Sequence, residues 1–158
     1  MVDSHGRFVW YELATTNVEA AKAFYAEVVG WGTQDASMPG AAYTLFTAGG
    51  DPVSGVTGLP EDARRWGLRP GWLGYVGVDD VDAAAERIKQ LGGAVHLPPM
   101  EIPNISRLSV GVDPQTATIA VFKWLNGNQE PPELNAPGRQ IQLAKATTAP
   151  MANVIAAS

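Results

Sequence analysis

Glu12 is the residue of this chain that is best placed to do chemistry. It lies in the segment Phe8-Val9-Trp10-Tyr11-Glu12-Leu13, whose aromatic and β-branched residues predict a strand. Because side chains alternate along a strand, Phe8 and Trp10 share the face of Glu12. A buried carboxylate among aromatic rings is costly unless Arg, Tyr, water or a ligand cation pairs with it. Glu12 could therefore orient a bound ligand or act as a general base.

Other residues suited to catalysis or metal binding are few. The chain has two histidines, His5 and His96, and no cysteine, which excludes thiolate nucleophiles, disulfides and Cys-type zinc sites. Donors for a displaced metal site are scattered, with His5, His96, Glu12 and Glu101 as the candidates. The sequence contains no G-x-S-x-G, G-x-x-x-x-G-K-[ST] or H-E-x-x-H motif. We therefore expect neither a metal nor a cofactor.

The elements that position Glu12 occur twice, with Val18 of the first copy corresponding to Val81, 63 positions later. After the strand at 8–13, Thr16-Asn17-Val18-Glu19 predicts a capping box and a helix that ends near Val29. In the second copy the strand is 72–78 and Asp79-Asp80 begins the helix. The buried stripes expected on the two helices are Val18, Ala21, Tyr25 and Val28, and then Val81, Ala84, Ile88 and Leu91.

Three short strands are expected after each helix, so that each copy is a βαβββ module and the fold class is α+β. In the first copy they are about 31–37, 42–47 and 53–57, and in the second about 94–97, 106–110 and 116–124. Pro98-Pro99 is expected to end the strand at 94–97. Four strands and one helix leave a sheet face bare, so neither module should be stable alone.

Length and composition indicate one domain with a tail. We expect a single domain over 1–125, comprising module one at about 7–59, a linker at 60–71 and module two at about 72–124. The segment 126–158 is rich in Asn, Gln, Pro, Ala and Thr and should be mobile or packed on a partner.

Charge and hydropathy exclude several functions. The net charge is −5 and the basic residues are scattered, which excludes a nucleic-acid partner. No apolar run reaches about 18 residues and no signal pattern is present, so the expected location is the cytoplasm, with no membrane partner.

The segment Asn17-Val18-Glu19-Ala20-Ala21-Lys22-Ala23-Phe24-Tyr25, with Val28-Val29-Gly30-Trp31 after it, resembles the first-helix signature of the vicinal oxygen chelate superfamily of glyoxalases, bleomycin-resistance proteins and dioxygenases. The second copy agrees through 78–84, Gly92-Gly93 and Asp113-Pro114-Gln115, and the resemblance covers about 7–124. It implies two tandem βαβββ modules whose curved mixed sheets enclose a cavity, often in a homodimer. It does not imply one particular reaction.

Enzymes of that superfamily bind a divalent metal through His, Gln and Glu on equivalent strands of both modules. The resemblance maps three of these places onto Trp10, Leu73 and Ala120, and the fourth onto the run Val53, Ser54, Gly55, Val56 and Thr57. None of these residues offers a carboxylate or an imidazole, so the family's metal site is expected to be absent.

Strand alternation also gives the expected lining of the cavity. It would consist of Phe8, Trp10, Glu12, Leu73, Tyr75, Thr118, Ala120 and Phe122. Such an aromatic and apolar wall would fit a small organic ligand, although the same side chains could simply fill the sheet interior. The leading hypothesis is a metal-independent small-molecule binding protein with an aromatic or apolar ligand.

Two alternatives remain open. The first is a lyase, isomerase or dioxygenase of the same fold that uses a displaced metal site or Glu12 as its acid/base. The second is a mainly structural domain whose tail binds a partner.

Overall fold

The computed structural model describes residues 4–37, 42–59, 63, 68–103 and 105–125. The predicted tail, 126–158, and most of the predicted linker lie outside these residues. The chain forms two compact units: one is Tyr11–Trp72, and the other joins the N-terminal residues through Trp10 to the segment that begins at Leu73. Each unit is described by itself below. Within the described residues, no helix has the length and apolarity needed to cross a bilayer.

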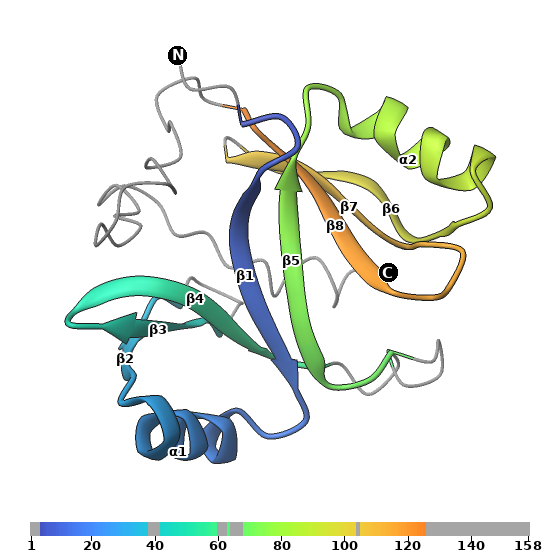
Figure 1. Ribbon diagram of the computed structural model, residues 1–158. Helices are drawn as coiled ribbons and strands as arrows, with labels where there is room; N and C mark the ends of the chain where they lie inside the picture. Colours follow the sequence, from blue (N-terminus) through green and yellow to red (C-terminus); the bar gives the residue numbers. More distant parts are fainter. Residues whose placement is uncertain (1–3, 38–41, 60–62, 64–67, 104, 126–158) are drawn as a thin grey trace. The chain divides into compact units, whose positions relative to one another are not determined.

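The first module has the predicted βαβββ order (Figure 1). Its elements are β1 (Phe8–Thr15), α1 (Val18–Val29), β2 (Gly32–Asp35), β3 (Thr44–Ala48) and β4 (Asp51–Gly58). The strands follow the order β2-β3-β4-β1. β1 and β4 are parallel and the other neighbours are antiparallel, so the sheet is mixed. Register places Glu12 opposite Gly55 and Leu13 opposite Val56.

Helix α1 begins and ends at residues with well-defined capping geometry. Asn17 is the N-cap, and its Oδ1 accepts a hydrogen bond of 2.9 Å from the amide of Ala20. The cap is therefore one residue beyond the Thr16 of the predicted capping box. Gly30 ends the helix in the left-handed region, at φ 73°, which a residue with a side chain rarely adopts.

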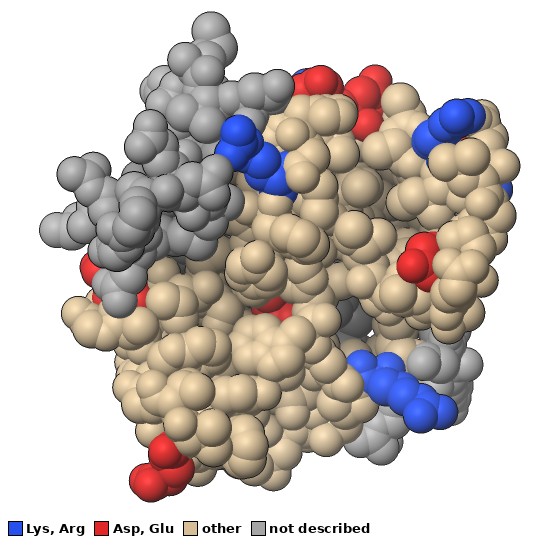
Figure 2. Space-filling view, viewed as in Figure 1, with Lys and Arg blue, Asp and Glu red and all other residues tan. Residues whose placement is uncertain are grey.

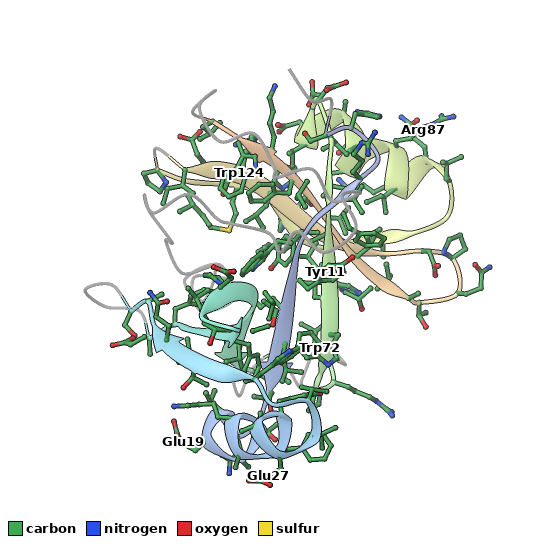
Figure 3. The ribbon with its side chains drawn as sticks, turned by 60° about the vertical axis from the view of Figure 1, so that its left-hand side comes forward. Tyr11, Glu19, Glu27, Trp72, Arg87 and Trp124 are labelled. Atoms are coloured by element: carbon green, nitrogen blue, oxygen red, sulfur yellow. The ribbon has the colours of Figure 1, made fainter. Side chains whose placement is uncertain are left out.

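Four aromatic rings anchor α1 to its sheet. Tyr25 of the helix stacks on Trp31 at 5.6 Å and meets Phe46 and Trp72 edge-on at 5.5 Å and 5.4 Å between centroids. The indole N–H of Trp72, which Figure 3 labels, also donates a hydrogen bond of 2.9 Å to the Tyr25 hydroxyl. Like Tyr25, the α1 residues Val18 and Ala21 pack on the core of Leu13, Phe46 and Val56. These three α1 residues belong to the stripe that was predicted to face the sheet.

The second module repeats the pattern. Its elements are β5 (Gly71–Gly77), α2 (Val81–Gln90), β6 (Ala94–Ile102), β7 (Ser106–Val112) and β8 (Thr118–Trp124), in the strand order β5-β8-β7-β6. β5 and β8 are parallel, and the remaining pairs are antiparallel. The predictions of an α+β fold and of two tandem βαβββ modules with mixed sheets are thus confirmed.

The N-terminal residues belong to the same unit as the second module, and backbone hydrogen bonds join them to the end of β5. The amide of Gly6 donates to the carbonyl of Gly77, and the amide of Gly77 donates to the carbonyl of Arg7, both at 2.9 Å. A Cβ at position 77 would lie 2.4 Å from the Ser4 carbonyl oxygen, so the close approach of the two segments requires glycine there.

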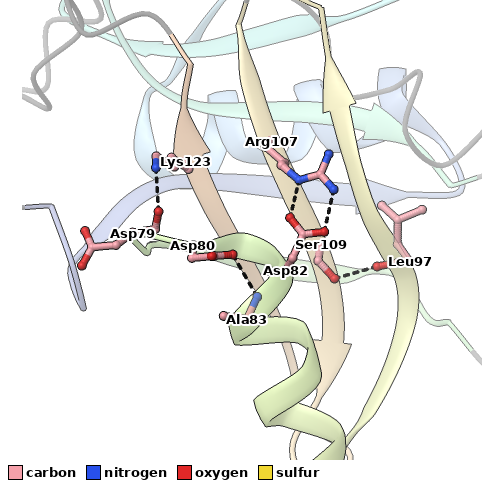
Figure 4. Close-up of polar contacts among 8 residues, drawn as sticks. All are labelled: Asp79, Asp80, Asp82, Ala83, Leu97, Arg107, Ser109 and Lys123. Atoms are coloured by element: carbon pink, nitrogen blue, oxygen red, sulfur yellow. Dashed lines mark hydrogen bonds and ion pairs between the residues drawn. The ribbon is translucent and has the colours of Figure 1, made fainter.

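Polar contacts fix the start of α2 (Figure 4). Asp80 is the N-cap and accepts a hydrogen bond of 2.9 Å from the amide of Ala83, as the predicted helix start requires. Arg107 of β7 donates two hydrogen bonds to Asp82, at 2.6 Å and 2.7 Å. These hydrogen bonds hold the pKa of the Asp82 carboxyl below its ordinary value of 3.8.

Three expectations about the elements were wrong. Val28 and Leu91, the last members of the predicted buried stripes, are 58% and 61% exposed, because each helix contacts its sheet through its earlier turns. Strand β6 also continues through Pro98 and Pro99 to Ile102, and the register shifts on both sides of Leu97. A proline lacks an N–H, but an outer strand with a bulge tolerates that loss.

Candidate functional site

The most distinctive polar feature of the first module is a buried hydrogen bond to Glu12. The Glu12 side chain is 1% exposed, and its Oε2 accepts a hydrogen bond of 2.9 Å from the hydroxyl of Tyr43, which is 3% exposed. Leu13 and Val56, the neighbours of Glu12 and Gly55 along the strands, pack in the core on the α1 side. Side-chain alternation therefore places Glu12 and Gly55 on the sheet face turned away from α1.

Gly55 makes room for this hydrogen bond. A Cβ at position 55 would lie 1.9 Å from the Tyr43 hydroxyl oxygen and 2.5 Å from Cζ, so the phenol ring crosses β4 where a side chain is missing. The Tyr43 backbone is held in turn by Ser37, whose Oγ accepts a hydrogen bond of 3.0 Å from the Tyr43 amide. Glu12 was predicted from the sequence as a carboxylate that needs a partner, whereas Tyr43 was not predicted to be that partner.

An aromatic row occupies one sheet face of the second module. Tyr75 pairs with Ala120 and Gly77 with Phe122 across β5 and β8, so these positions share a face with Leu73 and Thr118. Tyr75, Ala120 and Phe122 are at most 2% exposed, Leu73 is half-buried and Thr118 is exposed. The Tyr75 and Phe122 rings are perpendicular at 6.2 Å, and Phe122 meets Trp124 edge-on at 4.6 Å.

Trp124 belongs to this row and was missed, although alternation along 118, 120 and 122 leads directly to it. It pairs across the strands with Ser106. Its indole nitrogen and the Ser106 Oγ are both buried, and neither has a hydrogen-bond partner among the described residues. Figure 3 labels Trp124 on β8.

Phe8 and Trp10 differ in exposure although both lie on β1. Trp10 is 5% exposed and Phe8 is 45% exposed. The Phe8 ring takes the space that a side chain at position 74 would need, since a Cβ there would lie 2.4 Å from its Cε1. Alternation along β5 puts that space on the face opposite Leu73 and Tyr75. That Trp10, Glu12 and Tyr75 line one cavity stays a prediction.

The residues at the family's ligand positions do not fit a divalent cation. Trp10, Leu73 and Ala120 lie on β1, β5 and β8 as mapped, and offer an indole and two aliphatic groups. Glu12 hydrogen-bonds Tyr43, whereas His5 contacts Asp79 at 3.1 Å. His96 and Glu101 are exposed on β6. In the described part of the chain, no three His, Asp or Glu side chains form a group that could bind a metal.

The surface shows no large region of one charge sign on the face in view. Acidic and basic side chains are scattered there among uncharged residues (Figure 2).

Residues 7–121 match the model of the Glyoxalase/Bleomycin resistance protein/Dioxygenase superfamily. The chain belongs to this superfamily. The resemblance seen in the sequence is thereby confirmed.

Relatives within the superfamily carry different names. The chain is 35% identical over 116 residues to "Putative glyoxylase CFP32" of Mycobacterium tuberculosis, covering 72% of this chain and 44% of that protein. It is 33% identical over 140 residues to the anthracycline biosynthesis protein DnrV of Streptomyces peucetius, covering 82% of this chain and 50% of that protein. The chain thus spans about half the length of these curated relatives.

Solved structures of the superfamily share the fold. The chain superposes on methylmalonyl-CoA epimerase from Mycobacterium tuberculosis with a TM-score of 0.52, 15% identity, and coverage of 80% of this chain and 94% of the epimerase. A methylmalonyl-CoA epimerase in complex with methylmalonyl-CoA and NH4+ gives a TM-score of 0.51, at 19% identity and with coverage of 77% of this chain and 96% of that one. At these identities the likeness concerns the fold alone.

Proposed function

We propose that this chain binds a small, flat, mostly apolar organic molecule without using a metal, and that Glu12 and Tyr43 orient the ligand. The buried hydrogen bond between these two residues is the observation that carries the proposal. The Glu12 carboxylate and the Tyr43 phenol lie together on the sheet face away from α1, and the missing side chain of Gly55 leaves the space that the phenol ring needs. Such an arrangement exceeds what filling a sheet interior requires.

The chemistry of the pair favours a hydroxylated aromatic ligand. A carboxylate can accept about four hydrogen bonds, so a ligand hydroxyl could share Glu12 with Tyr43. The name of DnrV supports the same class, because anthracyclines contain a flat hydroxylated anthraquinone.

A dihydroxyanthraquinone titrated into the full chain tests the proposal, with tryptophan fluorescence and calorimetry as readouts. We expect saturable binding that survives EDTA, and about tenfold weaker binding for Tyr43→Phe, which keeps the ring and removes one hydroxyl. A control on the other sheet face, Thr33→Val, should leave the affinity unchanged, because Thr33 is exposed and pairs with Phe46 on the α1 side of the sheet. Absence of binding, or equal affinity in the Tyr43→Phe variant, would refute the proposal.

An enzyme that uses Glu12 as a metal-free general base is the second candidate, and the hydrogen bond from Tyr43 is the observation in its favour. Glu12→Gln separates the two candidates. A binding protein keeps its function when it keeps its affinity, whereas an enzyme should keep binding and lose turnover of its substrate.

A further inference from the structure

Two buried polar atoms at one end of the β7–β8 pair have no hydrogen-bond partner. Ser106 is fully buried, and neither its Oγ nor the indole nitrogen of Trp124 is paired in the part of the chain that the structure describes. Buried polar groups in native proteins are nearly always paired, because an unmade hydrogen bond costs the full desolvation of the group. The two atoms therefore require a partner that the described residues do not supply.

Strand register brings these two side chains together. Ser106 lies opposite Trp124. One position further out, the amide of Leu125 donates a 2.9 Å hydrogen bond to the carbonyl of Ile105, so these two form a hydrogen-bonded pair. The two kinds of pair alternate along antiparallel strands, which makes Ser106 and Trp124 a non-hydrogen-bonded pair, with Cα atoms about 4.5 Å apart and side chains at their closest. The hydroxyl and the indole therefore project side by side from one sheet face.

No charged residue of these two strands shares that face. β7 and β8 contain two charged residues, Arg107 and Lys123, which are next to Ser106 and Trp124 in sequence and so point to the opposite face. Figure 4 shows them on the α2 side, where Arg107 donates to Asp82 and Lys123 donates to a backbone carbonyl just before α2. An ionised group bound at Ser106 and Trp124 would receive no counter-charge from these strands.

We propose that Ser106 and Trp124 bind a neutral carbonyl oxygen of a small aromatic ligand, and we call the pair the carbonyl site. Both side chains can donate a hydrogen bond, and the indole N–H can only donate. A carbonyl oxygen has two lone pairs and no hydrogen, so it satisfies both donors without leaving a donor of its own unpaired. The Phe122 ring, which meets Trp124 edge-on at 4.6 Å, supplies an apolar wall beside the site.

A buried water fits the carbonyl site less well. Water molecules inside proteins typically make about three hydrogen bonds. Ser106 and Trp124 supply two, and the next pair on the same face, Leu108 and Phe122, is buried and apolar. A water that accepted both hydrogen bonds would turn its own hydrogens toward these apolar side chains.

The carbonyl site lies close to the surface, at the end of a strand. Trp124 is the last residue of β8 and is half-buried as a whole, and Leu125 after it is 38% exposed. A ligand can therefore approach along the strand ends. The carbonyl site belongs to the second module and does not depend on Glu12 or Tyr43, so it adds to the function proposed for that pair.

Fluorenone and fluorene are a matched pair of probes for the carbonyl site, because they share one flat tricyclic frame and only fluorenone has a carbonyl. We expect the full chain to bind fluorenone at least about tenfold more tightly than fluorene in equilibrium dialysis. The carbonyl stretching band of bound fluorenone should shift to lower frequency, because hydrogen bonding weakens the C=O bond. Fluorenone has no hydroxyl to share with Glu12, so Tyr43→Phe should leave the preference unchanged.

Substitutions assign the preference to the two donors. Ser106→Ala and Trp124→Phe each remove one donor, and each should reduce the preference for fluorenone about threefold to tenfold without weakening the binding of fluorene. Ser109→Ala is the matched control, since Ser109 is also fully buried on β7 but faces α2, and its Oγ donates a 2.8 Å hydrogen bond to the Leu97 carbonyl (Figure 4). In the ligand-free protein, Ser109→Ala should lower the urea midpoint and Ser106→Ala should not.

Two results would overturn the proposal. The first is a wild-type chain that binds neither probe, that binds fluorenone and fluorene equally, or whose preference survives both Ser106→Ala and Trp124→Phe. The second is a ligand-free Ser106→Ala variant that is destabilised as much as Ser109→Ala, which would show that the pair holds a buried water only.

Discussion

The hydroxyl of Tyr43 donates a 2.9 Å hydrogen bond to Oε2 of Glu12, although 31 positions separate the two residues in the sequence. Strand pairing brings them together. β3 pairs with β4, and β4 pairs with β1, so the start of β3 lies across Gly55 from Glu12. The middle strand contributes no side chain at that point, and the phenol fills the gap.

Gly55→Ala should destabilise the protein by about 1–3 kcal/mol, because the new methyl group would overlap the Tyr43 ring and force it aside. Urea denaturation measures this change. Gly58→Ala is the matched control on the same strand, since a Cβ at position 58 would meet no atom within 4 Å. Equal stability of the Gly55→Ala and Gly58→Ala variants would contradict the close contact.

Glu12 and Tyr43 should be energetically coupled. In a double-mutant cycle of Glu12→Gln and Tyr43→Phe, we expect a coupling free energy of unfolding of about 1.5–3 kcal/mol, as for a buried hydrogen bond to a charged group. Denaturant titrations of the four proteins provide the measurement. Additive effects of the two substitutions would show that the bond contributes nothing to stability.

The pair Asp82–Arg107 should make stability depend on pH in the acid range. The folded-state pKa of Asp82 lies below its unfolded value, so the stabilisation is complete above the ordinary value of 3.8 and is lost as the pH falls through the depressed pKa. Asp82→Asn should therefore lower the unfolding free energy at neutral pH and have less effect in acid. Arg107→Gln should remove the same dependence, and the double variant should remove no more.

Removal of divalent metal should leave the protein unchanged. We expect purified protein to contain far less than one equivalent of metal, and EDTA not to alter its melting temperature, because a ligand of the native state would stabilise it. Elemental analysis and thermal melting measure both. About one Zn, Ni, Fe or Mn per chain would instead support the enzyme candidate, with His5, His96, Glu12 and Glu101 as the first residues to substitute.

Trp10 should contribute to ligand affinity if it lines the binding site. Trp10→Ala is expected to weaken binding of the dihydroxyanthraquinone by about 2 kcal/mol, as for a buried aromatic anchor. Tyr11→Ala is the comparison, because Tyr11 points to the opposite face of β1 and is 39% exposed. Strong loss of affinity for Tyr11→Ala with none for Trp10→Ala would reverse the assignment of faces.

Short-range patterns in the sequence predicted most of the fold. Hydrophobic periodicity and helix-start residues identified both helices, and the repeat between Val18 and Val81 identified the two modules. The same patterns placed Glu12 correctly on β1 as a carboxylate needing a partner. They overestimated the buried faces at Val28 and Leu91, because periodicity does not tell where along its length a helix leaves the sheet.

Residues brought together by long-range pairing could not be predicted in this way. Tyr43 finds Glu12 only through the register of β3 on β4 and of β4 on β1, and nothing local in the sequence specifies that register. The need for a glycine at position 55 becomes evident only when the position of the Tyr43 ring is known, because the ring occupies the space of the missing side chain. Trp124, by contrast, was accessible to the alternation rule and was overlooked at the end of the strand.

The path of β6 through Pro98 and Pro99 has a consequence for aggregation. β6 ends the strand order of its module, so one side of its backbone has no neighbouring strand within it. Each proline removes an N–H from β6, and the two register shifts bend the strand. An extended segment of another chain would therefore find too few regularly spaced donors to continue the sheet. The prolines protect this edge against fibril-like growth, at little cost to the strand that carries them.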